Sequence, residues 1–173
     1  MSKMILVLGG ARSGKSNYAA LLAKGINKKT VFIATATALD EEMKERIRRH
    51  KISRPKNWGL IEEPLNLSKP LLGLKSVYDT ALIDCMGLWI SNLLMANMKD
   101  GQIEKKIKEL TKSILKAKIR QVIVVSNEVG TGLVPADPVS RRFRDLVGLA
   151  NQIMASEADE VIMMQAGIPV RIK

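Results

Sequence analysis

Short apolar runs alternate along the chain with segments whose apolar residues recur at helical spacing. Residues 4–8 form the first run, which is apolar at every position until it reaches Gly9 and Gly10. A run without polar alternation is typical of a strand that is buried on both faces of a sheet. Comparable runs predict further strands at residues 30–34, 58–61, 81–84, 122–125, 161–164 and 169–172.

Apolar positions spaced three and four residues apart predict helices between these strands. The predicted helices cover residues 16–23, 40–49, 88–98, 103–117 and 138–155. Asp40 and Asp137 stand at the start of two of them, and an aspartate there can accept hydrogen bonds from the first turn. Pro138 suits the first helical position, where no N–H is needed.

The alternation of strands and helices predicts an α/β fold with a mainly parallel, doubly wound sheet flanked by helices. The length of 173 residues suits one compact unit, so we expect residues 1–173 to form a single domain. Ligands of such sheets bind beyond the carboxyl ends of the strands. Candidate site residues at predicted strand ends are Gly9, Asp84, Asn127 and Glu128.

A phosphate-binding loop of the form G-x-x-x-x-G-K-[ST] follows the first predicted strand. The match consists of Gly9, Gly10, Ala11, Arg12, Ser13, Gly14, Lys15 and Ser16. Glycines let backbone N–H groups approach phosphate oxygens, and the N-terminus of the next helix adds positive charge. Lys15 can reach the β- and γ-phosphates of a nucleotide, and the Ser16 hydroxyl can ligate Mg²⁺. The alternative is a glycine-rich turn without a ligand, but the strand before it and the helix after it favour the phosphate loop.

A Mg²⁺-nucleotide site usually needs a carboxylate at a neighbouring strand end as well. Asp84 is the first candidate for this role, acting directly on the metal or through water, and Glu128 is the second. The alternative for each is a structural role, which for Asp84 is capping of the helix that follows it.

Composition limits the classes of partner. Lys and Arg total 28 against 17 Asp and Glu, and the net charge of +11 indicates an anionic partner such as nucleic acid, an anionic membrane or phosphorylated small molecules. Aromatic residues make up only 3%, too few for base-stacking surfaces. One cysteine excludes an intrachain disulfide framework and fits a reducing cytoplasm. No apolar run approaches the roughly 20 residues that a membrane span needs.

The single histidine, His50, lies in the most cationic stretch of the chain, among Arg46, Arg48, Arg49, Lys51, Arg54 and Lys56. Its spacing from Met43 and Ile47 puts the three residues on one helix face. A structural role near the end of a helix is one interpretation, since the helix dipole favours histidine there. The other is a nucleophile, because nearby cations keep an imidazole neutral and can also hold a triphosphate.

The sequence resembles one known family over nearly its whole length. Beyond the phosphate loop, the matching blocks lie at residues 40–43, 46–51, 82–85, 91–94, 125–130, 142–145 and 151–152. The family is that of the bifunctional adenosylcobinamide kinase/adenosylcobinamide-phosphate guanylyltransferases of cobalamin biosynthesis. Some relatives carry a His pair where this chain has Arg49 and His50, and some carry Glu where it has Asp84.

The resemblance implies a RecA-like P-loop fold and two reactions. A kinase step phosphorylates adenosylcobinamide with ATP or GTP, and a guanylyltransferase step then moves GMP from GTP to adenosylcobinamide phosphate, releasing pyrophosphate. His50 matches the histidine that carries GMP, and Lys15 is the catalytic lysine of the phosphate loop. Ser16 and Asp84 are the expected Mg²⁺ ligands, and the possible substrate or phosphate contacts are Arg49, Lys51, Arg54, Asn127 and Glu128. The resemblance also implies a homo-oligomer, typically a trimer.

Two other functions compete with this one. A monofunctional P-loop small-molecule kinase, with His50 structural, would turn over a nucleoside triphosphate without being labelled by GTP. A basic nucleic-acid-binding ATPase would use the net positive charge, but the shortage of aromatic residues argues against it. We therefore expect no nucleic acid partner, no membrane insertion and a cytoplasmic enzyme.

Overall fold

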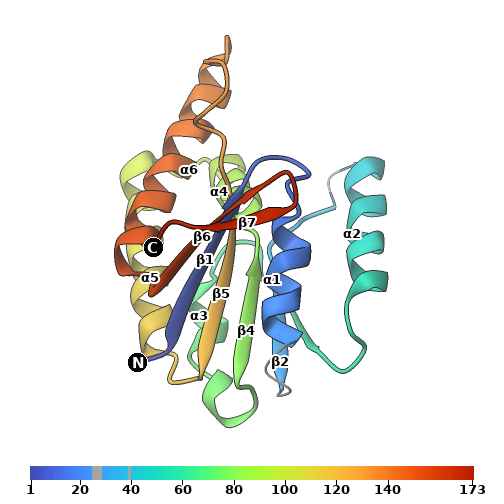
Figure 1. Ribbon diagram of the computed structural model, residues 1–173. Coiled ribbons are helices and arrows are strands. Elements are labelled where there is room, and N and C mark those ends of the chain that lie inside the picture. Colours follow the sequence, from blue (N-terminus) through green and yellow to red (C-terminus); the bar gives the residue numbers. More distant parts are fainter. Residues whose placement is uncertain (25–28, 39) are drawn as a thin grey trace.

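A seven-stranded sheet lies at the centre of the computed structural model, which describes residues 1–24, 29–38 and 40–173 (Figure 1). The side chains at positions 46, 50, 53 and 76 also lie outside the described part. The strands are β1 (Lys3–Gly9), β2 (Thr30–Ala34), β3 (Gly59–Glu62), β4 (Thr80–Asp84), β5 (Gln121–Asn127), β6 (Glu160–Gln165) and β7 (Ile168–Arg171). They lie in the order β3-β2-β4-β5-β1-β6-β7, and only β7 runs antiparallel to its neighbour. The predicted α/β fold with a mainly parallel sheet is confirmed.

Five helices correspond to the predicted ones: α1 (Lys15–Lys24), α2 (Glu41–Ser53), α4 (Met86–Met95), α5 (Asp100–Lys116) and α6 (Pro138–Glu157). The N-cap predictions are confirmed, since Asp40 accepts a hydrogen bond from the backbone N–H of Met43 and Asp137 accepts one from Ser140. Helix α2 runs past its predicted end at residue 49. Two short elements, α3 (Ser68–Leu71) and a 3-10 turn (Leu74–Ser76), were not predicted because they are too short to show a period.

Helix α4 ends before the predicted residue 98, and its last turn explains why. Asn97 has a left-handed backbone with φ of 57°. The N–H groups of Asn97 and Met98 donate back to the carbonyl oxygens of Leu94 and Leu93. These are the two hydrogen bonds of a Schellman motif, which closes a helix and satisfies its last carbonyl groups.

The sheet has a hydrophobic core on each face, and alternate residues of β1 enter the two cores. Met4 and Leu6 pack with helices α4, α5 and α6 on one face. Ile5 and Val7 pack on the other face with α1, which lies against β4 and β5. β1 is therefore buried on both faces, as its uninterrupted apolar run predicted.

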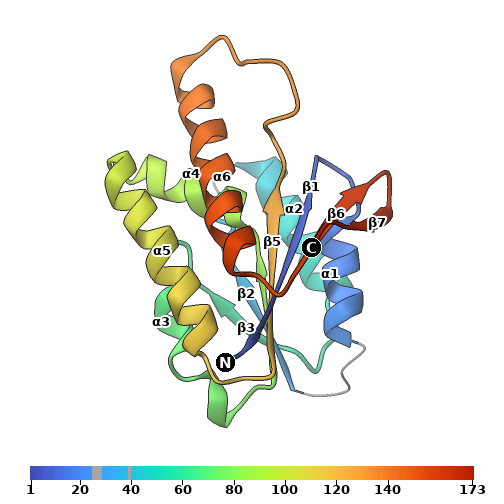
Figure 2. The same cartoon turned by 60° about the vertical axis from the view of Figure 1, so that its left-hand side comes forward.

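Two parts of the chain stand away from these layers. Helix α2 lies beside the body, separated from α1 in Figure 1. The segment after β5 and the first turns of α6 rise above the carboxyl ends of the strands (Figure 2). Within the described residues, none of the helices is both long and apolar enough to cross a membrane.

Candidate active site

Three neighbouring strands, β4, β5 and β1, end side by side at one edge of the sheet. Gly9 of β1 pairs with Asn127 of β5, and Asp84 of β4 pairs with Val125 of β5. The backbone N–H of Glu128 donates to the carbonyl oxygen of Gly9 at 3.0 Å. The fold thus brings together candidate residues that are more than 110 positions apart in the sequence.

The phosphate loop turns between β1 and α1 around the side chain of Lys15. Arg12 and Gly14 have positive φ angles of 54° and 91°, so the loop uses left-handed backbone at two positions. Lys15 is buried, and its Nζ donates a hydrogen bond to the carbonyl oxygen of Gly10 at 3.0 Å. The ammonium group is therefore held inside the loop, where phosphate oxygens bind in proteins with this motif.

The final hairpin supports the loop from the other side. The backbone N–H of Gly167, in the turn between β6 and β7, donates to the carbonyl oxygen of Ser13 at 3.1 Å. A Cβ at position 14 would lie 3.4 Å from the Cα of Gly167. At position 9, a Cβ would overlap the Oγ of Ser13 and lie 2.9 Å from the carbonyl oxygen of Met164. Gly9 therefore permits close packing that a larger residue would disturb, whereas at position 14 the φ of 91°, and not the space, favours glycine.

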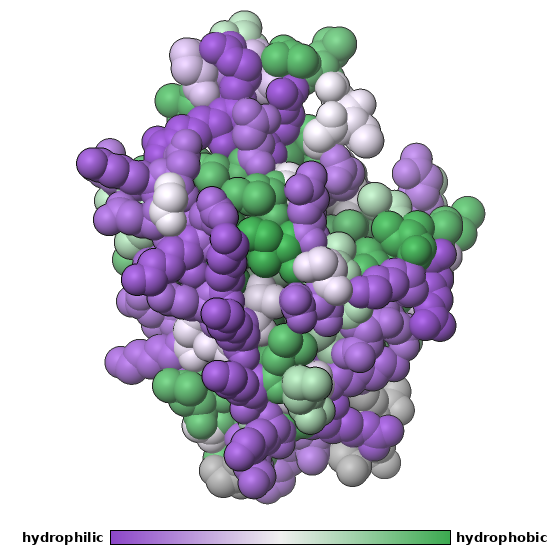
Figure 3. Space-filling model, turned by 90° about the vertical axis from the view of Figure 1, so that its left-hand side faces the viewer, coloured by the Kyte–Doolittle hydropathy of each residue, from purple (hydrophilic) through white to green (hydrophobic). Residues whose placement is uncertain are grey.

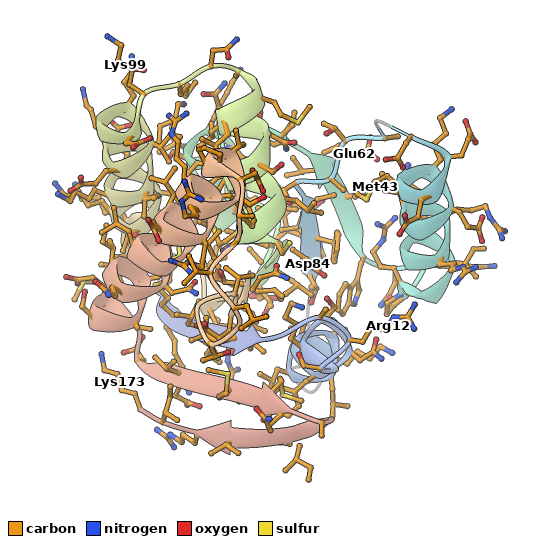
Figure 4. All side chains as sticks on the ribbon, turned by 90° about the horizontal axis from the view of Figure 1, so that it is seen from above. Arg12, Met43, Glu62, Asp84, Lys99 and Lys173 are labelled. Carbon is orange, nitrogen blue, oxygen red and sulfur yellow. The ribbon has the colours of Figure 1, made fainter. Side chains whose placement is uncertain are left out.

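A cavity, here called the nucleotide cavity, opens between the phosphate loop, the strand ends and α2 (Figure 4). Its lining combines polar groups from the loop and strand ends with apolar and charged groups from α2 and the strands β2 and β3. The lining residues are Lys15, Ser16, Phe32, Ala34, Ala36, Met43, Ile47, Lys51, Arg54, Leu60, Glu62, Asp84, Cys85, Leu88 and Asn127.

Asp84 lies at the end of β4 and faces this cavity, and it is not the N-cap residue of the next helix. The N-cap position of α4 is Cys85, whose own side chain makes no capping hydrogen bond. Thr35 holds the backbone here, because its Oγ1 accepts from the N–H of Cys85 and donates to its carbonyl oxygen, each at 2.8 Å. The buried side chain of Asn92 in turn donates to the carbonyl oxygen of Thr35 at 2.7 Å. Asp84 therefore lies on a rigidly held strand end.

The thiol of Cys85 is buried beside Asp84. Burial, followed by the negative charge of Asp84, raises its pKa to about 11. The thiol is therefore neutral at physiological pH, which agrees with a packing role and not a catalytic one.

Asn127 reaches the cavity from β5 and is fixed by a residue of α6. Asn151 is buried, accepts from the Oγ of Ser126 at 2.6 Å and donates to the carbonyl oxygen of Asn127 at 3.0 Å. The side chain of Glu128 lies elsewhere. Its Oε1 accepts from the N–H of Gly130, and it is not among the residues that line the nucleotide cavity.

The candidate cations of α2 and the residue after it have different surroundings. Arg49 is exposed, and with Arg48 it forms ion pairs to Glu45, which lower the pKa of Glu45 to about 2. Lys51 lines the cavity and pairs with Glu62 of β3 at 2.9 Å. Arg54 also lines the cavity, with its guanidinium 5.5 Å from the ring centre of Phe32. Lys51 and Arg54 are brought to the site, and Arg49 is not.

His50 belongs to α2, but its side chain lies outside the described side chains. The helix carries Met43, Ile47 and Lys51 to the cavity wall. Met43 and Ile47 are the two residues whose spacing the sequence analysis used to define the helix face of His50, so that face of α2 borders the cavity.

Several residues of this site did not emerge from the sequence. Phe32 and Glu62 look like ordinary strand residues until the fold brings them to the cavity. Thr35, Asn92 and Asn151 act through buried hydrogen bonds, and although Asn92 and Asn151 lie in blocks that match the family, their only local signal is a polar residue next to an apolar segment. Such a signal does not say which group is the partner.

Comparison with known structures and sequences identifies the fold class and the family of this chain. The fold matches the crystal structure of the RadB recombinase with a TM-score of 0.51 and 14% identity, over 93% of this chain and 73% of that chain. A likeness at such low identity shows the fold alone, and together with the phosphate loop it defines a P-loop NTPase of the RecA-like class. A model of one family, described as cobinamide kinase / cobinamide phosphate guanyltransferase, matches residues 5–172. The chain belongs to this family.

Two curated relatives support the assignment at full length. The bifunctional adenosylcobalamin biosynthesis protein CobP of Pseudomonas aeruginosa is 39% identical over 168 residues, which are 97% of this chain and 96% of the relative. The bifunctional adenosylcobalamin biosynthesis protein CobU of Escherichia coli is 37% identical, over 98% of this chain and 99% of the relative.

Proposed function

We propose that this protein phosphorylates adenosylcobinamide with ATP or GTP and then transfers GMP from GTP to adenosylcobinamide phosphate. The observation that carries the proposal is membership of the cobinamide kinase/guanyltransferase family, with a cavity that joins the phosphate loop to the helix of His50. Nothing in the comparisons supports the monofunctional kinase. The products of the second step are adenosylcobinamide-GDP and pyrophosphate.

In the kinase step, the hydroxyl oxygen of the aminopropanol arm attacks the γ-phosphorus of the nucleotide. A new O–P bond forms, the bond to the β–γ bridging oxygen breaks, and the hydroxyl gives up its proton. Lys15 neutralises charge on the β- and γ-phosphates, and the backbone N–H groups of the phosphate loop hold their oxygens. Positioning and charge neutralisation supply most of the catalysis in such transfers.

In the guanylyl step, an imidazole nitrogen of His50 attacks the α-phosphorus of GTP, and pyrophosphate leaves. A phosphate oxygen of adenosylcobinamide phosphate then attacks the same phosphorus and releases the histidine. Dividing the transfer into two displacements lets pyrophosphate leave before the bulky acceptor reacts. Lys51 and Arg54, which line the same cavity, supply positive charge for the phosphates.

Mg²⁺ fits the residues present, because Ser16 offers a hydroxyl and Asp84 a carboxylate to the same cavity. When bound with the nucleotide, Mg²⁺ offsets phosphate charge. Within the part of the chain that the structure describes, no three His, Cys, Asp or Glu side chains gather into a metal site. Two protein ligands are consistent with an ion that is held largely by phosphates and water.

We further propose that the protein forms a homo-oligomer, a trimer by family resemblance, folds as one domain and acts in the cytoplasm. The segment that leads into α6 and the first turn of α6 support self-association, because apolar side chains there are largely exposed in the described structure. Leu133 is 96% exposed, and Val134 and Val139 are about two-thirds exposed. In Figure 3, hydrophobic groups lie at the top of the face, where the segment lies, and others lie at its centre and right edge, among mostly hydrophilic groups.

Labelling with GTP tests the covalent step. We expect the protein to become labelled by GTP carrying ³²P at the α-phosphate, and the adduct to survive alkali and be lost in acid, as a phosphoramidate is. His50→Ala should remove the label but keep cobinamide phosphorylation. The measurement is radioactivity retained on denatured protein after each treatment.

Arg49→Ala is the matched control, because Arg49 adjoins His50 in the sequence but pairs with Glu45 outside the cavity. This variant should be labelled like the wild type. Equal labelling of His50→Ala and wild type would refute the role of His50. A protein that phosphorylates cobinamide but is never labelled would be the monofunctional kinase.

A further inference from the structure

A second hollow, here called the α1 groove, runs along the outer side of α1. One wall consists of the α1 residues Asn17, Ala20, Leu21 and Lys24, which recur at helical spacing. The opposite wall consists of Phe32 of β2 and residues 54–58 after α2, of which Arg54, Pro55 and Trp58 face the groove. Leu21 is 63% exposed, so the groove presents an apolar side chain to solvent.

The α1 groove meets the nucleotide cavity at the reacting centre. Four residues line both spaces, namely Ser16, Phe32, Arg54 and Asp84. Lys15, Lys51 and Asn127 line only the nucleotide cavity. The stacked side chains of Arg54 and Phe32 therefore stand where the two spaces join.

A transfer between two substrates needs two binding spaces that meet at the transferred phosphate. The nucleotide cavity contains the phosphate loop lysine, so it suits the nucleotide. The α1 groove reaches Ser16 and Asp84 without passing Lys15, so a second molecule can approach the same phosphate while the nucleotide is bound.

We propose that the α1 groove binds the acceptor, the arm of cobinamide that ends first in a hydroxyl and then in a phosphate. This inference rests on the proposed function. The apolar stretch formed by Ala20, Leu21, Pro55 and Trp58 contacts the hydrocarbon of the arm and the edge of the ring that carries it. The large ring stays at the groove mouth, and only the arm enters.

The positive charges of the groove suit the negative charge that the acceptor gains when its hydroxyl becomes a phosphate monoester. Arg54 lies at the inner end, beside Ser16 and Asp84, and Lys24 lies on the α1 wall. A neutral hydroxyl needs no cation, but the phosphate monoester made in the first step does. Arg54 can therefore retain the phosphorylated arm for the second transfer, by a hydrogen-bonded ion pair.

Leu21→Glu tests the groove. It puts a carboxylate in the apolar wall at a position where exposure leaves the fold intact. We expect the Kd of cobinamide and its KM in the kinase reaction to rise about tenfold or more, since the leucine contact is lost and a charge is desolvated. The Kd of GTP should not change. Equilibrium dialysis, followed by cobinamide absorbance, gives the first value.

Leu72→Glu is the matched control, because Leu72 is 80% exposed and lines neither space. Leu21→Met should restore cobinamide binding. The groove assignment is overturned if wild type and Leu21→Glu bind cobinamide equally well. It is also overturned if neither protein binds cobinamide. A raised Kd for GTP with unchanged cobinamide binding also overturns it and assigns the groove to the nucleotide. A wild type that binds cobinamide in the groove but does not phosphorylate it contradicts the proposed function alone.

Discussion

Two adjacent glycines of the phosphate loop have different surroundings. A Cβ at position 9 would meet Ser13 and Met164, whereas a Cβ at position 10 would meet nothing within 4 Å. The motif alone treats position 9 as fixed and position 10 as free, and the packing gives the reason. The close approach of the loop to β6 depends on Gly9.

Gly9→Ala should therefore weaken nucleotide binding more than Gly10→Ala. Because backbone must move to admit the methyl group at position 9, we expect the Kd of GTP to rise about tenfold, or about 1.4 kcal/mol. Fluorescence titration with a labelled GTP analogue measures the Kd of both variants. Equal effects in the two variants would contradict the packing explanation.

At the scale of elements, the hairpin of β6 and β7 contributes to the site through its turn. All four residues of β7 are exposed, so this strand adds little to the cores. The turn has positive φ angles at Ala166 and Gly167, and Gly167 donates to the carbonyl oxygen of Ser13. The hairpin thus acts as a support for the phosphate loop.

Gly167→Ala should strain this turn and loosen the loop. The φ of 84° costs a residue with a Cβ about 1 kcal/mol, so Tm should fall by about 2–4 °C and the Kd of GTP should rise. Gly148→Ala is the control, because Gly148 lies inside α6 with open space around it, and alanine is the better helix former. This control should raise Tm without changing the Kd. An unchanged Kd in Gly167→Ala would show that the turn does not support the loop.

The sequence was sufficient to predict those helices and strands whose buried residues recur in a regular pattern. The seven strands and five of the helices followed from apolar runs and periods, and the cap residues followed from their type. The order of strands was not predictable, because it depends on pairings such as Lys3 with Gln121 that no local pattern encodes. The same holds for α3, which is one turn long.

The residues of the candidate site likewise fall into those that the sequence could predict and those that it could not. The phosphate loop and the strand-end carboxylate are visible in the sequence because their spacing is fixed by local chemistry. The pairing of Lys51 with Glu62 and the stacking of Arg54 on Phe32 join separate elements and became visible only in the fold. Arg49 looked equivalent to Lys51 in the sequence. The two residues are about half a helical turn apart, however, and Arg49 pairs with Glu45 on its own helix.

At the scale of the whole molecule, the cations behind the net charge of +11 lie partly on the outer helices and partly at the site. On α5, Lys108 pairs with Glu104, and Arg142 of α6 pairs with Asp100. These cations are not among the residues that line the nucleotide cavity. Lys15, Lys51 and Arg54 line the nucleotide cavity, where positive charge serves a triphosphate.

The protruding segment before α6 gives a test of assembly. Replacing Leu133 and Val134 with Glu should shift the protein from an oligomer to a monomer, because two charges would enter an apolar contact. Light scattering coupled to size exclusion measures the mass. Leu72→Glu, an exposed leucine elsewhere, should leave the mass unchanged. A monomeric wild type, or a double variant with unaltered mass, would contradict the proposed interface.

The position of β1 in the sheet has a consequence for biosynthesis. β1 leads into the phosphate loop and is made before the other strands, but its neighbours are β5 and β6, whose residues lie at 121–127 and 160–165. Until those residues have left the ribosome, the strand has no partner on either side and cannot hold the loop in shape. Such non-local pairing delays folding. GTP therefore cannot stabilise the nascent chain through this loop until β5 and β6 have been made.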